Sequence, residues 1–313
     1  MGEKVFITGA TGFVGANLAA ALVEEGYEVH ALLREGSDDW RLQPIVSSLK
    51  VRKGDVTRYE HLERTLSEIR PDYILHLAAY GAYPDVQTSM ERIVETNYLG
   101  TVNLVRASAG IKYKMLINTG SSSEYGLKEG PMEEEDIPSP VNYYGAAKAA
   151  ATIMCQTYSR LEDKPIVTLR PFSVYGPWEE PIRLIPQVIS HCLRGEDMSL
   201  TEGSQVRDFI YVDDVVAAYM KAMERPDLAG EIINVGSGIQ HSIRETAETI
   251  HGLMDSRIKL NFGVRGKREN EPLSWVANTS KAEELLGHKT AYDLEAGLSE
   301  TIDWIGKHPE RYR

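Results

Sequence analysis

The chain has 313 residues, with 34 Lys and Arg against 46 Asp and Glu, so its formal net charge is −12. Hydrophobic residues make up 42% and charged residues 26%, which is typical of a globular protein and excludes collagen-like, disordered and membrane-spanning classes. The excess of acid argues against nucleic acid or an anionic membrane as the main partner.

The two cysteines, Cys155 and Cys192, are too few for a disulfide framework, and neither has a metal-ligand neighbour at zinc-like spacing. We therefore expect reduced, structural cysteines and no metal site. The first residues run directly into the apolar segment Val5–Ile7 and lack the features of a secretory signal. This start favours a cytoplasmic protein.

Strand-like and helix-like segments alternate through the first half of the chain. The segments that predict strands are Lys4–Thr8, Val29–Leu33, a third that begins at Lys50–Val51 and ends at Gly54-Asp55, Tyr73–Leu77, Met115–Thr119 and Ile166–Leu169. The segments between them that carry helical spacing are Asn17–Glu25, Glu60–Ile69, Ile93–Ala109 and Tyr144–Tyr158. This alternation predicts an α/β fold with a Rossmann-type, doubly wound parallel sheet.

After Arg170 the pattern changes, because prolines interrupt the chain and the predicted elements become shorter. We expect a short helix at Ile185–Leu193, a strand at Ile232–Val235 and a helix at Ser280–Leu286. The organisation predicts a dinucleotide-binding domain over 1–172 to which 208–235 returns. The rest, 173–207 and 236–313, is expected to form a smaller mixed α/β domain for the substrate.

A glycine-rich loop follows the first strand and opens the first helix. Its glycines, Gly9, Gly12 and Gly15, permit a tight turn, a close approach to a pyrophosphate and close packing of helix on strand. Because the N-terminus of a helix attracts anions, the loop predicts dinucleotide binding. The other loop residues expected at the cofactor are Thr11, Phe13 and Val14.

The end of the second strand distinguishes the two nicotinamide dinucleotides. An acid there binds the ribose 2′-hydroxyl of NAD, whereas an arginine accommodates the 2′-phosphate of NADP. The chain has Arg34 and Ser37, with Glu35 between them, and no acid at the strand end itself. This pattern favours NADP(H) and leaves NAD(H) open. Asp55, followed by Val56, is placed to cap the adenine amino group.

Tyr144 and Lys148 are four residues apart in a helical segment, so their side chains share one face. A nearby ammonium lowers the pKa of a phenol, which suits proton transfer at an alcohol oxygen. Ser121 follows the strand that ends at Thr119 and is placed to hydrogen-bond the reacting oxygen. Tyr143 is offset from the lysine-facing row and is expected to line a wall or pack.

These motifs, in this order, resemble the extended short-chain dehydrogenase/reductase family that acts on nucleotide sugars. Further matching stretches include His76–Ala79, Val174–Pro177, Arg207–Asp214 and Asn234–Gly238. The likeness covers almost the whole chain and is nearest to GDP-mannose dehydratase and GDP-4-keto-6-deoxymannose reductase.

The resemblance assigns roles to individual residues. It implies a catalytic triad of Ser121, Tyr144 and Lys148. It implies further cofactor contacts at Leu77, Ala78, Ala79, Asn97, Thr119, Pro171, Ser173 and Val174. It implies substrate contacts at Tyr80, Ser122, Ser123, Tyr143, Arg207, Arg268 and Glu271, with both arginines on the nucleotide diphosphate.

Several activities of this family remain open on the sequence alone. A 4,6-dehydratase carries an acid two places before the tyrosine of its Tyr-Gly pair, where this chain has Ser123. The main hypothesis is therefore an NADPH-dependent reductase of a nucleotide-linked 4-keto-(6-deoxy)hexose, because the acid typical of NAD binding is missing. The alternative is a nucleotide-sugar 4-epimerase with retained NAD(P)+. A dehydratase ranks below both, and a non-catalytic dinucleotide-binding protein ranks last.

The helices predicted at Ile93–Ala109 and Tyr144–Tyr158 have apolar faces that suit the four-helix interface of a homodimer, as in relatives. The expected partners are thus a nucleotide-diphosphate sugar and a second copy of the chain.

Overall fold

The computed structural model describes residues 2–82, 89–266 and 274–312. Seven parallel strands form the central sheet, in the order β10-β6-β5-β4-β1-β2-β3. These strands are β1 (Lys4–Thr8), β2 (Glu28–Leu33), β3 (Lys50–Lys53), β4 (Tyr73–His76), β5 (Met115–Thr119), β6 (Ile166–Pro171) and β10 (Ile232–Val235). The order reverses at β1 and β4, so the sheet is doubly wound. The fold class expected from the sequence is confirmed.

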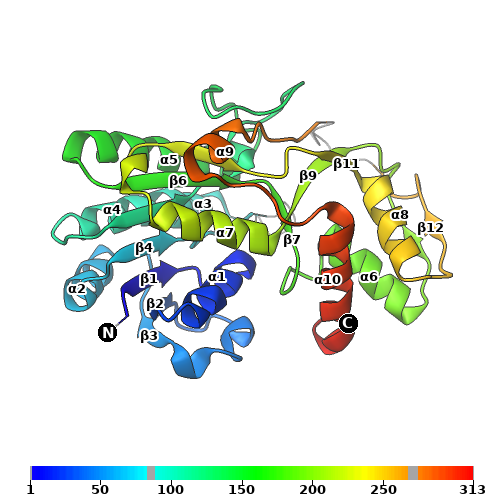
Figure 1. Ribbon diagram of the computed structural model, residues 1–313, viewed down its shortest axis with the longest axis horizontal. Coiled ribbons are helices and arrows are strands. Elements are labelled where there is room, and N and C mark those ends of the chain that lie inside the picture. Colours follow the sequence, from blue (N-terminus) through cyan, green and yellow to red (C-terminus); the bar gives the residue numbers. More distant parts are fainter. Residues whose placement is uncertain (1, 83–88, 267–273, 313) are drawn as a thin grey trace.

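Helices cover both faces of this sheet (Figure 1). On one face lie α1 (Phe13–Glu24) and α7 (Val212–Met223), and on the other lie α2 (Tyr59–Ile69), α4 (Gly100–Ser108) and α5 (Tyr143–Glu162). Because both faces are buried, most of these strands are largely apolar, whereas the edge strand β3 is polar and mostly exposed.

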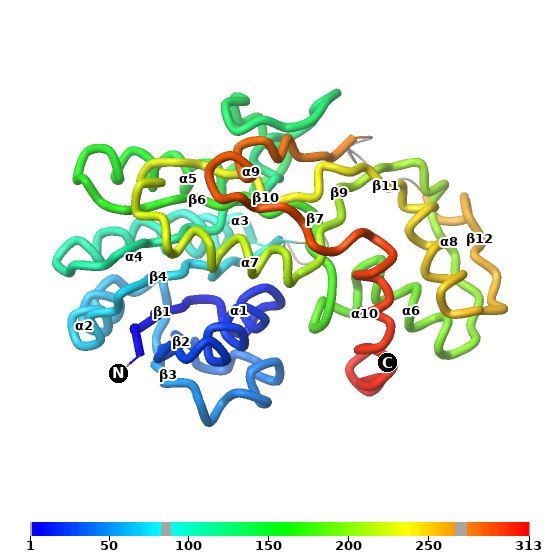
Figure 2. The backbone as a smooth tube through the Cα atoms, viewed as in Figure 1, coloured from blue at the N-terminus to red at the C-terminus, as the bar shows by residue number. Residues whose placement is uncertain are grey.

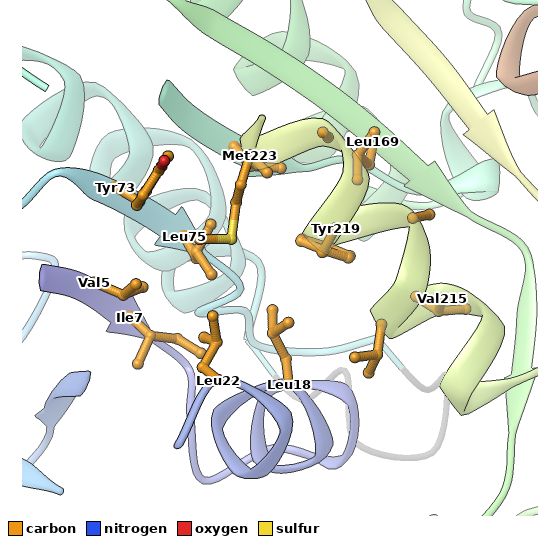
Figure 3. Packing of buried hydrophobic residues seen from close by; sticks show 14 of the residues in the cluster. Val5, Ile7, Leu18, Leu22, Tyr73, Leu75, Leu169, Val215, Tyr219 and Met223 are labelled. Atoms are coloured by element: carbon orange, nitrogen blue, oxygen red, sulfur yellow. The ribbon is translucent and has the colours of Figure 1, made fainter. Parts of the chain in front are cut away.

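Figure 3 shows the core between α1 and α7. Leu18 and Leu22 of α1 face Tyr219 and Met223 of α7, with side chains of β1, β4 and β6 completing the cluster. All of these side chains are buried. Since α1 begins at the glycine loop, its packing against α7 fixes the direction in which the N-terminus of the helix points.

One helix predicted from the sequence is divided. Instead of a single helix over 93–109, the chain forms α3 (Met90–Val94), a π-helical turn (Glu95–Leu99) and α4. A π-helical turn is uncommon and is often found beside a functional site. Here it contains Asn97, whose contacts are described below.

The remaining elements form a smaller lobe. Its sheets are β11-β9-β7 and β12-β8, built from β7 (Ser173–Tyr175), β8 (Met198–Ser199), β9 (Val206–Tyr211), β11 (Gln240–Ser242) and β12 (Leu260–Asn261). Its helices are α6 (Leu184–Arg194), α8 (Ile243–Leu253) and α10 (Leu294–Lys307), which contact one another, whereas α9 (Ser280–Leu286) contacts β10. Figure 2 shows α6, α8 and α10, which are far apart in sequence, lying close together. Sequence periodicity did not predict α7, α8 or α10.

After β6 the chain passes into the smaller lobe at β7, returns to the large sheet, and enters the smaller lobe again at β11. β7 and β9 pair with each other in the small sheet, and α7 and β10 then return to the large one. The return therefore begins with α7 at Val212, whereas the sequence placed it at residue 208. The domain limits stay a prediction. Within the described ranges, no helix combines the length and apolar character needed to cross a bilayer.

Candidate functional site

A cleft of about 390 Å³ lies at the carboxyl end of the central sheet. It contains the point where the strand order reverses, because the loops after β1 and β4 both line it. Ligands of doubly wound sheets bind in this crevice. Its lining residues are Thr8, Gly9, Thr11, Gly12, Phe13, Val14, Gly15, Leu32, Arg34, Ser37, Arg41, Gly54, Asp55, Val56, Leu77, Ala78, Ala79, Ala82, Thr96, Thr119, Tyr144, Lys148 and Glu180.

The glycine loop is tight enough to require its glycines. Gly9 has φ +76°, and a Cβ there would lie 2.5 Å from the backbone nitrogen of Ala78. A Cβ on Gly15 would lie 2.2 Å from the carbonyl oxygen of Gly9. Without these Cβ atoms the loop packs against the end of β4 and the start of α1. The N-terminus of α1 thus faces the cleft with a bare backbone, which fits a pyrophosphate.

The far end of the cleft, where β2 and β3 end, is lined by the oppositely charged residues Arg34 and Asp55. Arg34 is exposed and lines the cleft, and the Ser37 hydroxyl donates to the Arg34 carbonyl at 2.7 Å. Glu35 is also exposed but is not among the lining residues. Asp55 lines the cleft and accepts hydrogen bonds from the backbone and hydroxyl of Thr57, both at 2.9 Å.

Arg41 bridges the glycine loop and the smaller lobe. Its guanidinium donates to the carbonyl oxygens of Thr11 and Trp178 and pairs with Glu180 at 2.8 Å. Arg41 is buried, and both members of the ion pair line the cleft. The sequence did not indicate either residue, because they are 139 positions apart and match no local motif.

A buried hydrogen-bonded chain holds the loop after β4. The His76 ring bonds the Thr8 hydroxyl at 2.7 Å and the Thr101 hydroxyl at 2.9 Å. Burial, with a smaller effect of the Lys148 charge, lowers the pKa of His76 to about 3, so the ring is neutral. Asn97 bonds both the N–H and the C=O of Tyr80, each at 2.8 Å.

Asn97 therefore supports the cleft wall from behind. It is fully buried and is not among the lining residues, although the resemblance implied a cofactor contact. Pro171, Ser173 and Val174 likewise do not line the cleft, and Val174 packs in the hydrophobic core. The other predicted cofactor residues all line it.

Lys148 and Tyr144 lie together on α5. The Lys148 ammonium donates to the Thr119 carbonyl at 2.8 Å and lies 5.9 Å from the centre of the Tyr144 ring. Burial lowers the pKa of Lys148 to about 8, against the opposing effect of the Glu124 carboxylate. Tyr144 is buried and lines the cleft. The pair predicted from spacing thus meets the cleft at the end of β5.

Ser121 begins the short turn that follows β5, referred to below as the serine turn (residues 121–124). Its hydroxyl accepts from the Ser123 N–H at 3.1 Å, and its own N–H donates to Glu124 at 2.8 Å. The start of α5 packs against this turn, since a Cβ on Gly145 would lie 2.3 Å from the Ser123 carbonyl oxygen. Ser121 itself is half-buried and is not among the lining residues.

The predicted substrate residues are more dispersed. The Ser122 hydroxyl accepts from the Trp275 indole at 2.8 Å, and the Arg207 guanidinium lies 6.0 Å from the centre of the Trp275 ring. Tyr80 lies beneath the Arg92 guanidinium, 4.1 Å from the ring centre, and Tyr143 is exposed at the start of α5. Ser123 is half-buried in the serine turn. Arg268 and Glu271 lie outside the described residues.

Sequence reasoning missed seven lining residues: Thr8, Leu32, Arg41, Gly54, Ala82, Thr96 and Glu180. Thr8, Leu32 and Gly54 adjoin predicted strand ends, so proximity could have indicated them. Over the described ranges, no cluster of three His, Cys, Asp or Glu side chains is arranged to hold a metal ion.

The doubly wound sheet, the glycine loop at its reversal point and the tyrosine–lysine pair define a dinucleotide-dependent enzyme of the extended short-chain dehydrogenase/reductase class. The chain belongs to the NAD dependent epimerase/dehydratase family, whose model matches residues 5–236. The resemblance inferred from the sequence is confirmed.

The chain is similar to nucleotide-sugar enzymes along its whole length. It is 29% identical to UDP-glucuronate 4-epimerase of Thermodesulfobacterium geofontis, over 97% of this chain and 96% of the relative. Its structure matches UDP-glucuronic acid 4-epimerase of Bacillus cereus in complex with UDP-glucuronic acid and NAD, with a TM-score of 0.87, 29% identity and coverage of 97% and 99%. It also matches UDP-glucose 4-epimerase of Thermotoga maritima, with a TM-score of 0.88, 26% identity and coverage of 98% and 99%.

Proposed function

We propose that the protein is a nucleotide-sugar 4-epimerase that retains its dinucleotide through each turnover. The observation that carries the proposal is the position of Tyr144 and Lys148, beside the serine turn, at a dinucleotide cleft in a chain whose relatives include 4-epimerases. The comparisons favour this alternative over the reductase, which was the main hypothesis from the sequence.

The roles of the residues follow from their positions. The bare backbone of the glycine loop and the N-terminus of α1 hold the pyrophosphate. The chemistry that the dinucleotide supplies is reversible acceptance of a hydride from C4 of the sugar. Tyr144 takes the proton of the C4 hydroxyl and returns it to the oxygen after the 4-keto sugar has turned over. Ser121 donates a hydrogen bond to that oxygen, and the Lys148 ammonium stabilises the Tyr144 phenolate.

The serine turn gives a reason to rank water elimination below epimerisation. The position two residues before Tyr125 is Ser123, which cannot act as the acid of a dehydratase. The nearby carboxylate, Glu124, is fully buried and paired with Arg170 at 2.8 Å. It therefore does not replace the missing acid.

The proposed function is tested by assaying the freshly purified protein on UDP-glucose and UDP-glucuronic acid with no added dinucleotide. We expect conversion at C4, with oxidised dinucleotide recovered from the denatured protein by mass spectrometry. An empty site, together with turnover of a 4-keto sugar that consumes added NADPH, would instead support the reductase. Release of a 4-keto-6-deoxy product would support the dehydratase.

The choice of dinucleotide is a separate part of the proposal. The structural neighbours bind NAD, but Arg34 and Ser37 line the far end of the cleft and Glu35 does not. We propose that this end accepts the 2′-phosphate of NADP(H). Arg34→Ala is expected to weaken NADPH binding by about tenfold, the loss of one exposed charge-assisted contact, and to leave NADH binding unchanged. Titration of both dinucleotides into stripped protein measures this. Equal losses for both would contradict the proposed phosphate contact.

We propose that the protein is a homodimer and that it is cytoplasmic, as expected from the sequence. Large apolar side chains are exposed on the neighbouring helical segments α3 to α5: Met90, Val94, Leu99, Ile153 and Leu161. Pairing these segments with their copies would remove this surface from water.

Sedimentation at micromolar concentration is expected to give a mass near twice 34.9 kDa. Ile153→Glu is expected to shift it towards the monomer, because a charge would be buried in the apolar contact. A monomer mass for the unmodified protein would contradict the dimer.

A further inference from the structure

The buried carboxylate of Glu124 has no role in the mechanism described so far. One of its oxygens, Oε1, accepts hydrogen bonds from the Ser121 N–H at 2.8 Å and from the Thr152 hydroxyl at 3.0 Å. Ser121 begins the serine turn, and Thr152 lies on α5, one turn beyond Lys148. Glu124 thus joins the turn that carries the serine to the helix that carries the tyrosine and lysine.

The other oxygen, Oε2, is held by Arg170 on β6. Both Nε and Nη2 of the guanidinium lie 2.8 Å from it. Nη1 of Arg170 donates to the Tyr125 hydroxyl at 2.8 Å, and this hydroxyl donates to Asn234 of β10 at 2.6 Å. Three segments of the central domain therefore meet at a single carboxylate: the serine turn, α5 and β6. Arg170 and Tyr125 extend this network to β10.

The surroundings leave little freedom for this carboxylate. Glu124 and Arg170 are almost completely buried. Gly120 admits the carboxylate because it has no side chain, since a Cβ there would lie 2.6 Å from Oε1. Burying an ion pair costs solvation energy that burying two apolar side chains of similar size does not. Stability alone therefore does not explain an ion pair at this position. Its geometry suits a role in orientation.

We propose that Glu124 is a positioning residue for the reaction. Its carboxylate, held in place by Arg170, fixes the position of Ser121 relative to Tyr144 and Lys148. This inference rests on the proposed function, since it concerns the same reacting oxygen. Glu124 touches neither the sugar nor the dinucleotide, and it acts through the Ser121 N–H and through α5.

The same carboxylate affects the charge of Lys148. The titratable groups facing Lys148 are Glu124 from the serine turn, Tyr144 and Cys155 from α5, and His76 from β4. Burial lowers the pKa of Lys148, and the negative charge of Glu124 opposes that change. Removing the charge is expected to lower the lysine pKa further. The loss of activity at alkaline pH, as Lys148 deprotonates, would then begin at a lower pH.

Glu124→Gln tests the proposal. An amide accepts hydrogen bonds at one oxygen only, so the variant cannot serve both the Arg170 side and the Ser121 side. We expect kcat to fall about 10²-fold, the cost of misplacing a reacting group, with KM changed by less than about twofold. The alkaline limb of the kcat profile is expected to move to lower pH. A purely structural role would reduce the active fraction and leave this limb in place.

Glu134→Gln is the matched control. Glu134 is a second buried carboxylate nearby, and it accepts from the Asn234 N–H at 2.7 Å without contacting Ser121 or α5. The control is expected to keep kcat and the pH profile of the parent.

The double variant Glu124→Gln/Arg170→Met covers the case in which an unpaired Arg170 prevents folding of the single variant. It removes both charges, so it is expected to regain thermal stability and to keep the low kcat. Recovery of kcat would overturn the proposal, because the pair would then serve stability only.

Tyr144→Phe, measured in parallel, separates the two hypotheses. Full turnover in Tyr144→Phe would refute the proposed function. Loss of turnover in Tyr144→Phe, combined with an unchanged rate and profile in Glu124→Gln, would refute the role of Glu124 alone.

Discussion

Tyr144→Phe is expected to lower kcat for conversion at C4 by about 10²- to 10⁴-fold, the usual contribution of a general acid–base group. The phenol hydroxyl is the only part removed, so the fold and the dinucleotide cleft are expected to persist. Stopped-flow absorbance of the reduced nicotinamide, after mixing with substrate, measures the affected step directly. Slow reduction together with unchanged substrate affinity is the expected result.

Tyr158→Phe provides the control for this variant. Tyr158 lies on the same helix and packs against the apolar cluster beneath the sheet, away from the cleft. Loss of the Tyr158 hydroxyl is expected to leave kcat within about twofold of the parent value. If Tyr144→Phe retained the rate of the parent, another group would have to exchange the proton.

Gly9→Ala is expected to destabilise the fold by about 3 kcal/mol, from left-handed backbone strain together with overpacking. The added Cβ would meet the Leu77–Ala78 backbone at 2.5 Å, and backbone at the end of a central strand cannot move aside. Because the same loop forms the pyrophosphate cradle, the variant is also expected to lose its dinucleotide. Urea unfolding and mass spectrometry of the purified protein measure the two effects.

Gly26→Ala separates the two causes. Gly26 has φ +82°, close to the value at Gly9, but an added Cβ would have nothing within 4 Å. Its substitution is expected to cost about 1 kcal/mol, the strain contribution alone. Equal costs at the two glycines would show that the close approach at Gly9 contributes nothing.

Local sequence patterns predicted much of the central domain. The strand Lys4–Thr8, the glycine loop after it and the tyrosine–lysine spacing are all short-range features, and the structure places each of them at the cleft. The alternation of strands and helices led to the correct fold class because a parallel sheet needs a crossover helix between its strands. The catalytic and binding roles of these residues stay predictions.

The parts that were missed depend on contacts between distant positions. Arg41 and Glu180 meet only because the smaller lobe folds back over the glycine loop. Glu124 is buried and paired with Arg170, which lies 46 positions further along the chain. The contacts that connect it to Ser121 and α5 are tertiary, and no spacing rule describes them. The helix α7 was missed because its apolar positions follow directly from strand β9 without a break.

The late position of β10 in the chain has a consequence for biosynthesis. Until residues 232–235 have left the ribosome, strand β6 is an open edge with unpaired backbone groups, and Tyr125 lacks its Asn234 acceptor. A nascent chain that ends before this strand therefore exposes an unpaired, aggregation-prone edge of the sheet. Its Tyr125 hydroxyl also lacks the Asn234 acceptor. The sheet of the central domain is complete only after β7, α6, β8 and β9 of the smaller lobe have been synthesised. The central domain therefore cannot finish folding before part of the smaller lobe has been made.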